Sequence, residues 1–227
     1  MIVLSIDTST QNACAAIMSD KGLIAEYTIS NKKTHSQNIM PMIEDMLKKS
    51  SVTMDMIDAF AVTVGPGSFT GLRIGMATAK TFSQVMKKPI VGVSTLEALA
   101  NNHIMSDKLI CPIIDARRGD VYNALYKSGE CKVLQRAINI NDLLEEIKGE
   151  SVVFCGDGAE VYKDIIVEKM GDNAMFSPLS LNGTRGSSVC EVALRRLSRG
   201  DVDDAYTLNP AYLRVSQAER EYAEKNK

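Results

Sequence analysis

Apolar residues along the first third of the chain fall into short runs that are separated by polar turns. The runs at residues 2–6, 13–18 and 23–29 have the length of β-strands, and Asp20-Lys21-Gly22 is a typical hairpin turn between the last two. Further short apolar runs at 59–64 and 90–93 are typical of buried strands. The pattern therefore predicts an antiparallel meander that continues into a mixed sheet.

Two longer segments have apolar residues at helical spacing. The first spans about 36–48, and the second follows the N-cap candidate Ser68 and runs to about 86. In the second, small residues recur every four positions, which allows another element to approach closely at a cost of about 1 kcal/mol for each glycine. Both helices could simply cover the sheet, but we favour contact with a partner helix. The candidate interface residues are Ser36, Ile39, Met40, Ile43, Met46, Leu72, Gly75, Met76, Ala79 and Phe82.

The second half of the chain repeats the mixture of strands and helices. Capping boxes at Ser94–Glu97 and Ser188–Glu191 predict helix starts at both places. A boundary near 103–108 would divide the chain into units of residues 1–105 and 106–213, followed by a charged tail at 214–227. Strands are expected at 109–114, 121–126, 132–138 and 152–155, and helices from 141, from 158 and from 188.

Composition places the chain among ordinary globular proteins. It has 227 residues, 45% of them apolar and 24% charged, with a net charge of −2. A protein that binds nucleic acid by itself usually has an excess of basic residues, which this chain does not have, so DNA is not an expected partner. The five cysteines have no metal-binding spacing and predict reduced thiols in a cytoplasmic protein without a membrane segment.

Two turns carry the clearest candidate chemistry. Asp7 ends the first strand and is followed by hydroxyl residues, a pattern that suits either hydrated Mg²⁺ with phosphate or a plain Asx turn. Gly65-Pro66-Gly67 turns the chain into the helix after Ser68, whose free N–H groups could hold an anion. The alternative is a simple strand-to-helix turn, which the spacing alone favours because the stretch is neither G-x-G-x-x-G nor a Walker A loop. The candidate cofactor-binding residues, as a remnant phosphate site, are Asp7, Thr8, Ser9, Gly65, Gly67 and Ser68.

Other catalytic arrangements find little support. The two histidines, His35 and His103, lie in different segments, and a catalytic zinc needs about three protein ligands. No G-x-S-x-G nucleophile elbow occurs. We therefore predict no catalytic residues and no metal site. The segment 115–120 is either a charged hairpin or, through its two arginines, a docking surface.

Taken together, several motifs resemble the TsaB family, whose members are smaller paralogues of TsaD and were once filed among putative glycoproteases. The likeness covers most of the chain and is most specific up to residue 125. Its motifs are Ile6-Asp7-Thr8-Ser9-Thr10, His35-Ser36-Gln37, Gly65-Pro66-Gly67-Ser68-Phe69-Thr70-Gly71-Leu72-Arg73-Ile74-Gly75, Gly92-Val93-Ser94-Thr95-Leu96-Glu97-Ala98-Leu99, Asp115-Ala116-Arg117-Arg118-Gly119 and Pro210-Ala211-Tyr212-Leu213-Arg214.

The resemblance implies an actin-like, Hsp70-like ATPase (ASKHA) fold with two α/β lobes, each a mixed sheet flanked by helices. It also implies a role in forming N6-threonylcarbamoyladenosine at position 37 of tRNAs that read codons beginning with A. In that family TsaD transfers the threonylcarbamoyl group, while TsaB and TsaE are required accessories. The TsaB chain pairs with TsaD, or with itself when alone, through two helices of the first lobe, and tRNA is reached through the complex.

The chain departs from TsaD in two places. Where TsaD has a histidine-rich metal motif, this chain has Ser94-Thr95-Leu96-Glu97, and its Gly156-Asp157-Gly158 turn is a weak adenosine signature. We expect weak or no ATP binding by the chain itself, with ATP and Mg²⁺ held by partner subunits. The alternatives are a small ATPase or peptidase that acts alone, or a free tRNA-binding module.

Overall fold

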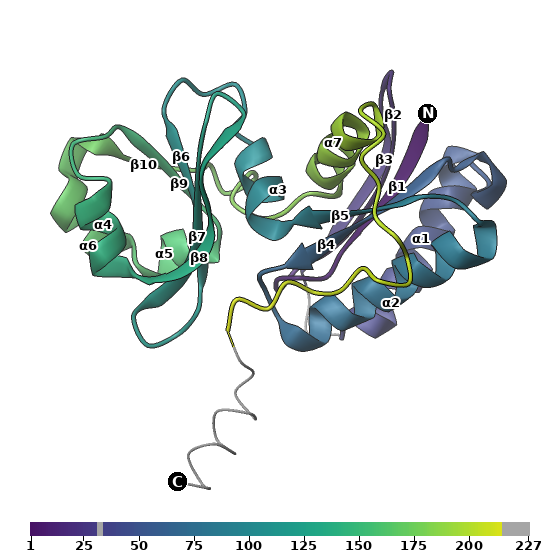
Figure 1. Cartoon of the computed structure of the whole chain (residues 1–227), viewed down its shortest axis with the longest axis horizontal. Coiled ribbons are helices and arrows are strands. Elements are labelled where there is room, and N and C mark those ends of the chain that lie inside the picture. Colours follow the sequence, from purple (N-terminus) through teal and green to yellow (C-terminus); the bar gives the residue numbers. More distant parts are fainter. Residues whose placement is uncertain (31–33, 215–227) are drawn as a thin grey trace, which may run out of the picture.

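The computed structural model describes residues 1–30 and 34–214, which form two α/β lobes lying side by side (Figure 1). Residues 31–33 lie outside the described residues, as does the predicted charged tail apart from Arg214. No described helix combines the length and the apolar character that crossing a membrane requires.

The first lobe is built on a five-stranded mixed sheet with the order β3-β2-β1-β4-β5. The predicted meander is confirmed, because β1 pairs antiparallel with β2 and β2 with β3, while β4 runs parallel to both β1 and β5. The strands are β1 (Ile2–Asp7), β2 (Ala13–Ser19), β3 (Gly22–Ile29), β4 (Ala59–Gly65) and β5 (Ile90–Ser94).

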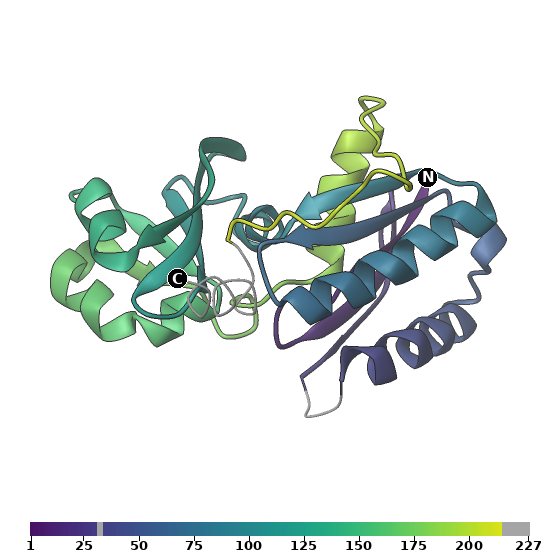
Figure 2. The ribbon, with the colours of Figure 1, turned by 60° about the horizontal axis from the view of Figure 1, so that its bottom comes forward.

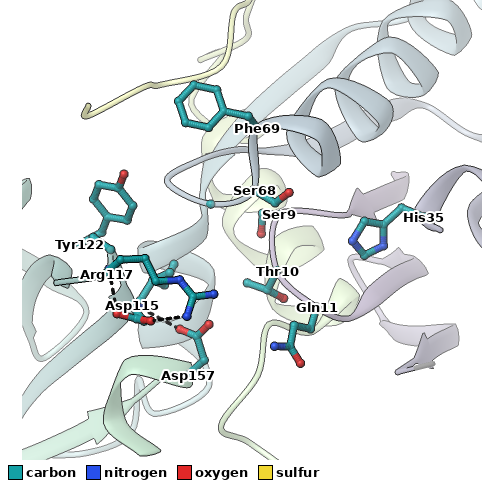
Figure 3. Close-up of a pocket in the computed structure, with 13 residues that line it drawn as sticks. Ser9, Thr10, Gln11, His35, Ser68, Phe69, Asp115, Arg117, Tyr122 and Asp157 are labelled. Carbon is teal, nitrogen blue, oxygen red and sulfur yellow. Dashed lines mark hydrogen bonds and ion pairs between the residues drawn. The ribbon is translucent and has the colours of Figure 1, made fainter. Parts of the chain in front are cut away.

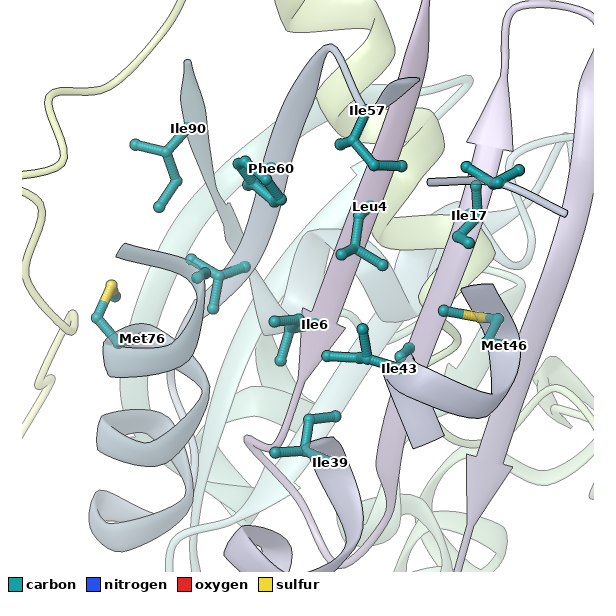
Figure 4. Packing of buried hydrophobic residues seen from close by; sticks show 14 residues of the cluster. Leu4, Ile6, Ile17, Ile39, Ile43, Met46, Ile57, Phe60, Met76 and Ile90 are labelled. Carbon is teal, nitrogen blue, oxygen red and sulfur yellow. The ribbon is translucent and has the colours of Figure 1, made fainter. Parts of the chain in front are cut away.

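Helices cover both faces of this sheet (Figure 2). On one side α1 (His35–Ser50) and α2 (Phe69–Met86) pack on the strands, with the short helix η1 (Met54–Met56) between them in sequence. Alternation along β1 explains the two layers. Leu4 and Ile6 face α1 and α2 (Figure 4), while Val3 belongs to the cluster on the opposite side of the sheet. The main core of the lobe therefore lies under α1 and α2.

The second lobe repeats the topology of the first. Its sheet has the order β10-β9-β6-β7-β8. When β6 is counted as the first strand of its lobe, this order read from β8 to β10 is 3-2-1-4-5, as in the first sheet. The sequence predicted four of these strands but not β10. The strands are β6 (Leu109–Asp115), β7 (Asp120–Lys127), β8 (Glu130–Asn139), β9 (Val152–Cys155) and β10 (Ala174–Phe176), and the helices are α4 (Ile140–Glu146), α5 (Asp157–Val161), α6 (Lys163–Met170) and the short η2 (Gly171–Asn173).

Each repeat ends in a helix that packs between the lobes or on the other lobe. Helix α3 (Thr95–Asn101) ends the first repeat and places Leu96 and Leu99 against the second sheet. Helix α7 (Gly186–Leu197) ends the second repeat and packs on the first sheet through Val189 and its neighbours. The boundary expected near 105 is where the chain enters the second sheet, but the predicted unit 106–213 is wrong at its end, because α7 returns the chain to the first lobe.

Neither predicted capping box forms. The Ser94 hydroxyl donates to Gln135 Oε1 of the second lobe at 2.8 Å instead of capping α3. Helix α7 starts at Gly186, before Ser188, and a carboxylate from β3 accepts hydrogen bonds from its first turn. Glu26 of β3 accepts hydrogen bonds at 2.8 Å from both the backbone N–H and the hydroxyl of Ser187.

This carboxylate leads to a pH-dependent prediction. Burial alone raises the pKa of Glu26, but hydrogen bonds from Arg185 and Ser187 outweigh it and lower the pKa below its ordinary value. A depressed pKa stabilises the fold above the unfolded-state value of about 4.3 and stops doing so as the pH falls through the folded-state value. Glu26→Gln should therefore lower the free energy of unfolding by about 1–3 kcal/mol at neutral pH.

Urea unfolding of both proteins between neutral and acidic pH checks this, and the difference between them should shrink as the pH falls. Glu44→Gln, at an exposed position of α1, is the matched control and should leave stability unchanged. A deficit of Glu26→Gln that stayed constant at every pH would contradict the assignment.

Candidate functional site

The turn between β1 and β2 is organised by a fully buried carboxylate. Asp7 Oδ1 accepts hydrogen bonds from the Ser9 backbone N–H at 2.9 Å, from the Ser9 hydroxyl at 2.6 Å and from the Thr63 hydroxyl at 2.6 Å. Its other oxygen, Oδ2, is buried without a hydrogen-bond partner among the described residues. Asp7 thus forms the Asx turn that the sequence allowed, and it also ties β1 to β4.

The start of α2 rests directly on this turn. As predicted, Ser68 is the N-cap, and its hydroxyl accepts from the Gly71 N–H at 3.2 Å. The Ser68 N–H itself donates to the Ser9 carbonyl at 2.7 Å. A Cβ added to Gly67 would lie 2.3 Å from the Ser9 carbonyl oxygen, and one added to Gly71 would lie 2.0 Å from that of Thr8. The glycines therefore serve close packing of the chain on itself.

A polar cleft of about 540 Å³ separates the two lobes (Figure 3). One wall is the β1–β2 turn together with the start of α2, and the other is the β6–β7 turn together with the start of α5. A smaller hollow, lined by Asn182 and Gly183, continues from it past Thr10 and Gln11. Residues that line the main cleft include Ser9, Thr10, Gln11, His35, Gly67, Ser68, Phe69, Asp115, Arg117, Tyr122 and Asp157.

The wall from the second lobe is acidic but internally paired. Asp115 accepts from the Tyr162 hydroxyl at 3.0 Å and forms an ion pair with Arg117 at 3.2 Å, while its backbone N–H donates to Asp157 Oδ1 at 3.1 Å. Burial raises the pKa of Asp157 above its ordinary value. The segment 115–120 is thus the hairpin turn that joins β6 to β7, one of the two readings that the sequence left open.

Comparison with known proteins identifies the family. Residues 22–222 match a family model described as TsaD, tRNA N6-adenosine threonylcarbamoyltransferase. The tRNA threonylcarbamoyladenosine biosynthesis protein TsaB of Bacillus subtilis is 34% identical over 233 residues, which cover 100% of both chains. The chain belongs to the TsaB family. The resemblance inferred from its motifs is confirmed.

Solved structures establish the fold of this TsaB-family chain as actin-like. A Pseudomonas aeruginosa protein, described as similar to the peptidase YeaZ, superposes with a TM-score of 0.79 at 25% identity, covering 94% of this chain and 99% of that one. An activator of 2-hydroxyisocaproyl-CoA dehydratase from Clostridium difficile, solved with bound ADPNP, has a TM-score of 0.55 at 11% identity, with coverage of 90% and 99%. The predicted ATPase-type architecture is confirmed.

The structure brings only half of the predicted phosphate residues to the cleft of this TsaB-family chain. Ser9, Gly67 and Ser68 line it, whereas Asp7, Thr8 and Gly65 lie behind its wall. The sequence reasoning singled out the segment 115–120 and the Gly156-Asp157-Gly158 turn, but it did not assign them to the same site as the first-lobe residues. The internal repeat is the signal that could have identified this site. Asp115 ends β6 as Asp7 ends β1. In the same way, Gly156-Asp157-Gly158 follows β9 and leads into α5, as Gly65-Pro66-Gly67 ends β4 and leads into α2.

The predicted partner interface needs a correction. Gly75 faces the sheet, where an added Cβ would lie 2.5 Å from the Thr8 hydroxyl, and Phe82 lies against Phe60 with ring centroids 5.7 Å apart. Only Ser36 and Met40 of the set are exposed. The small and apolar positions at helical spacing did indicate the packed sides of α1 and α2, but these sides contact the sheet of the same lobe and not a partner. The residues buried between the helices and the sheet are Ile39, Ile43, Met46, Leu72, Gly75, Met76 and Ala79.

Proposed function

We propose that this chain is a non-catalytic subunit of the complex that forms threonylcarbamoyladenosine at position 37 of tRNAs reading codons beginning with A. In this proposal it acts in the cytoplasm as the dimerisation partner and activator of a TsaD-type transferase, with TsaE as a further subunit and tRNA contacted through the complex. Membership of the TsaB family supports the pathway, since its relatives are named for threonylcarbamoyladenosine biosynthesis.

One observation carries the non-catalytic part of the proposal. In an ATPase of this architecture, the N-terminus of a helix such as α2 would present N–H groups to a phosphate. Here the Ser68 N–H is bonded to Ser9 and the Gly71 N–H to the Ser68 hydroxyl, so these two donors are already used. This partial occupation supports weak or no nucleotide binding by the chain itself, and we derive no step through a nucleotide or a metal ion.

In this proposal the partner binds the outer side of α1 and α2. Met40 is 47% exposed on α1, and Val85 is 72% exposed on α2. The exposed positions Arg73, Ala77 and Thr81 recur every four residues along α2 and so share one side of the helix. This side therefore offers one large exposed apolar side chain on each helix, next to small residues that would let a partner approach closely.

Size-exclusion chromatography with light scattering tests the assembly directly. We expect a homodimer from the chain alone and a heterodimer after mixing with the TsaD-type partner. A chain that stayed monomeric, and that eluted separately from the partner with or without ATP, would contradict the proposal.

Nucleotide titration separates the proposal from its first alternative, an ATPase that acts alone. Because two of the N–H donors at the start of α2 are engaged, isothermal titration of the isolated chain with Mg-ATP should give only the heat of dilution. Micromolar binding, or ATP turnover without partners, would instead favour the ATPase. Peptide cleavage by the isolated chain would favour a peptidase, and strong salt-sensitive tRNA binding would favour a free RNA-binding module.

A further inference from the structure

The chain after α7 forms a strap, residues 201–214, that runs back across the first lobe (Figure 1). At its start the Asp203 backbone N–H donates to the Ile90 carbonyl at 2.9 Å, and its carboxylate accepts from the Gly92 N–H at 2.8 Å. Farther along, Lys80 of α2 donates to the Leu208 carbonyl at 3.0 Å. The strap is thus fixed to both the sheet edge and α2.

The strap then crosses the start of α2. The Ala211 N–H donates to the Val64 carbonyl at 2.7 Å, and a Cβ on Gly65 would lie 2.9 Å from the Ala211 carbonyl oxygen. Tyr212 stacks on Phe69, with ring centroids 4.5 Å apart and planes 15° from parallel, and its hydroxyl accepts from Arg73 at 3.0 Å. Its aromatic ring therefore lies against a residue that lines the cleft.

The last described residue leaves the first lobe. Arg214 donates to the Ala116 carbonyl of the β6–β7 turn at 3.2 Å and forms an ion pair with Asp120 at the start of β7, both in the second lobe. The hydrogen bond from Arg214 lowers the pKa of Asp120 below its ordinary value. The same turn holds Asp115 and Arg117 in the wall of the cleft.

The strap is distinct from the two covalent crossings between the lobes, at 102–108 and 177–185. Asn102 holds those crossings together through hydrogen bonds to the carbonyls of Leu181 at 2.8 Å and Gly183 at 2.9 Å. They lie beside the part of the cleft that Gly183 lines, whereas Arg214 lies beside the part that Tyr122 lines. The two crossings alone would let one lobe rotate relative to the other about a hinge. The contact of Arg214 with the second lobe, at a different part of the cleft, restricts that rotation.

We propose that Tyr212 and Arg214 form an interlobe latch, which holds the β6–β7 turn against the start of α2 and keeps the cleft at one opening angle. In two-lobed proteins a bound ligand commonly draws the lobes together about a hinge. In this chain a segment of the polypeptide makes that connection. The latch goes beyond the proposed function, and it gives a role to the motif Pro210-Ala211-Tyr212-Leu213-Arg214.

Distance measurement between spin labels tests the latch in the full chain. Cys131 is exposed on β8 of the second lobe, and Leu23→Cys adds one exposed thiol on β3 of the first lobe, outside the proposed partner surface. The labelled chain is diluted into an excess of unlabelled chain, so that the distances measured lie within one copy. The other four cysteines are buried, so these two positions take the labels. The otherwise unchanged chain should give one narrow distance distribution, and Arg214→Ala should give a broader one with added longer distances.

Asp120→Asn removes the charge from the opposite lobe and should broaden the distribution in the same way, which keeps the test valid if Arg214→Ala fails to fold. Arg199→Ala, at an exposed arginine after α7, is the matched control and should leave the distribution narrow. Unchanged narrow distributions in both Arg214→Ala and Asp120→Asn, with intact urea midpoints, would overturn the latch.

Discussion

Replacing Gly71 by alanine should lower the free energy of unfolding by about 3 kcal/mol, at the upper end of the usual cost of overpacking. The added Cβ would lie 2.0 Å from the Thr8 carbonyl oxygen, a backbone atom that cannot rotate away. Helix propensity alone predicts the opposite sign, since alanine is favoured over glycine inside a helix by about 1 kcal/mol. The sign of the change, measured by urea unfolding, therefore reports whether α2 is packed on the β1–β2 turn.

Two further variants sharpen this test. Thr70→Ala changes the exposed neighbouring residue to the same amino acid and should leave stability within about 0.5 kcal/mol. Gly75→Ala should clash with the Thr8 hydroxyl, so Thr8→Ala should partly rescue it but should not rescue Gly71→Ala. A stabilising Gly71→Ala would show that the helix does not rest on the turn.

An aspartate on the outer side of α1 or α2 should weaken binding to the TsaD-type partner by about 100-fold, equivalent to about 2.7 kcal/mol. Met40→Asp and Ala77→Asp each place a charge on a surface that, in our proposal, the partner desolvates. Both positions are exposed, so the urea midpoint of the isolated chain should not change. Affinity for the purified partner, measured by isothermal titration, checks the prediction.

Leu134→Asp is the matched control, because Leu134 is 78% exposed on β8 of the second lobe. It should bind the partner as tightly as the unmodified chain. Full affinity in both Met40→Asp and Ala77→Asp would place the partner surface elsewhere. Substitutions at Gly75 or Ala79 cannot answer this question, because both residues pack inside the lobe.

Local signals predicted most of the elements. The meander, the buried strands and the Ser68 cap depend on short-range patterning, and each lies within a residue or two of its predicted place. The recurrence of Gly71, Gly75 and Ala79 correctly indicated close approach on one side of α2. It could not say what approaches, because the Thr8 turn that fills the space lies more than sixty residues earlier in the chain.

Features that depend on the whole fold escaped prediction. The predicted unit 106–213 was wrong at its end, because α7 packs on the first sheet. That packing, like the packing of α3 against the second sheet, depends on contacts between segments far apart in the chain. The Ser188 capping box failed because Glu26, from another strand, serves the first turn of α7. The second wall of the cleft was not predicted for a similar reason. The segments that hold Asp115 and Asp157 were noticed separately, but their correspondence to the first-lobe turns follows only from the repeated topology.

The formation of threonylcarbamoyladenosine in a reconstituted reaction tests the central claim most directly. The reaction would contain an unmodified tRNA that reads codons beginning with A, threonylcarbamoyl-adenylate, ATP, and purified TsaD-type and TsaE-type proteins, with or without this chain. We expect modification only when the chain and the transferase are both present, and none from the chain alone. Modification by the chain alone, or the same rate without it, would contradict its assignment as a non-catalytic activator.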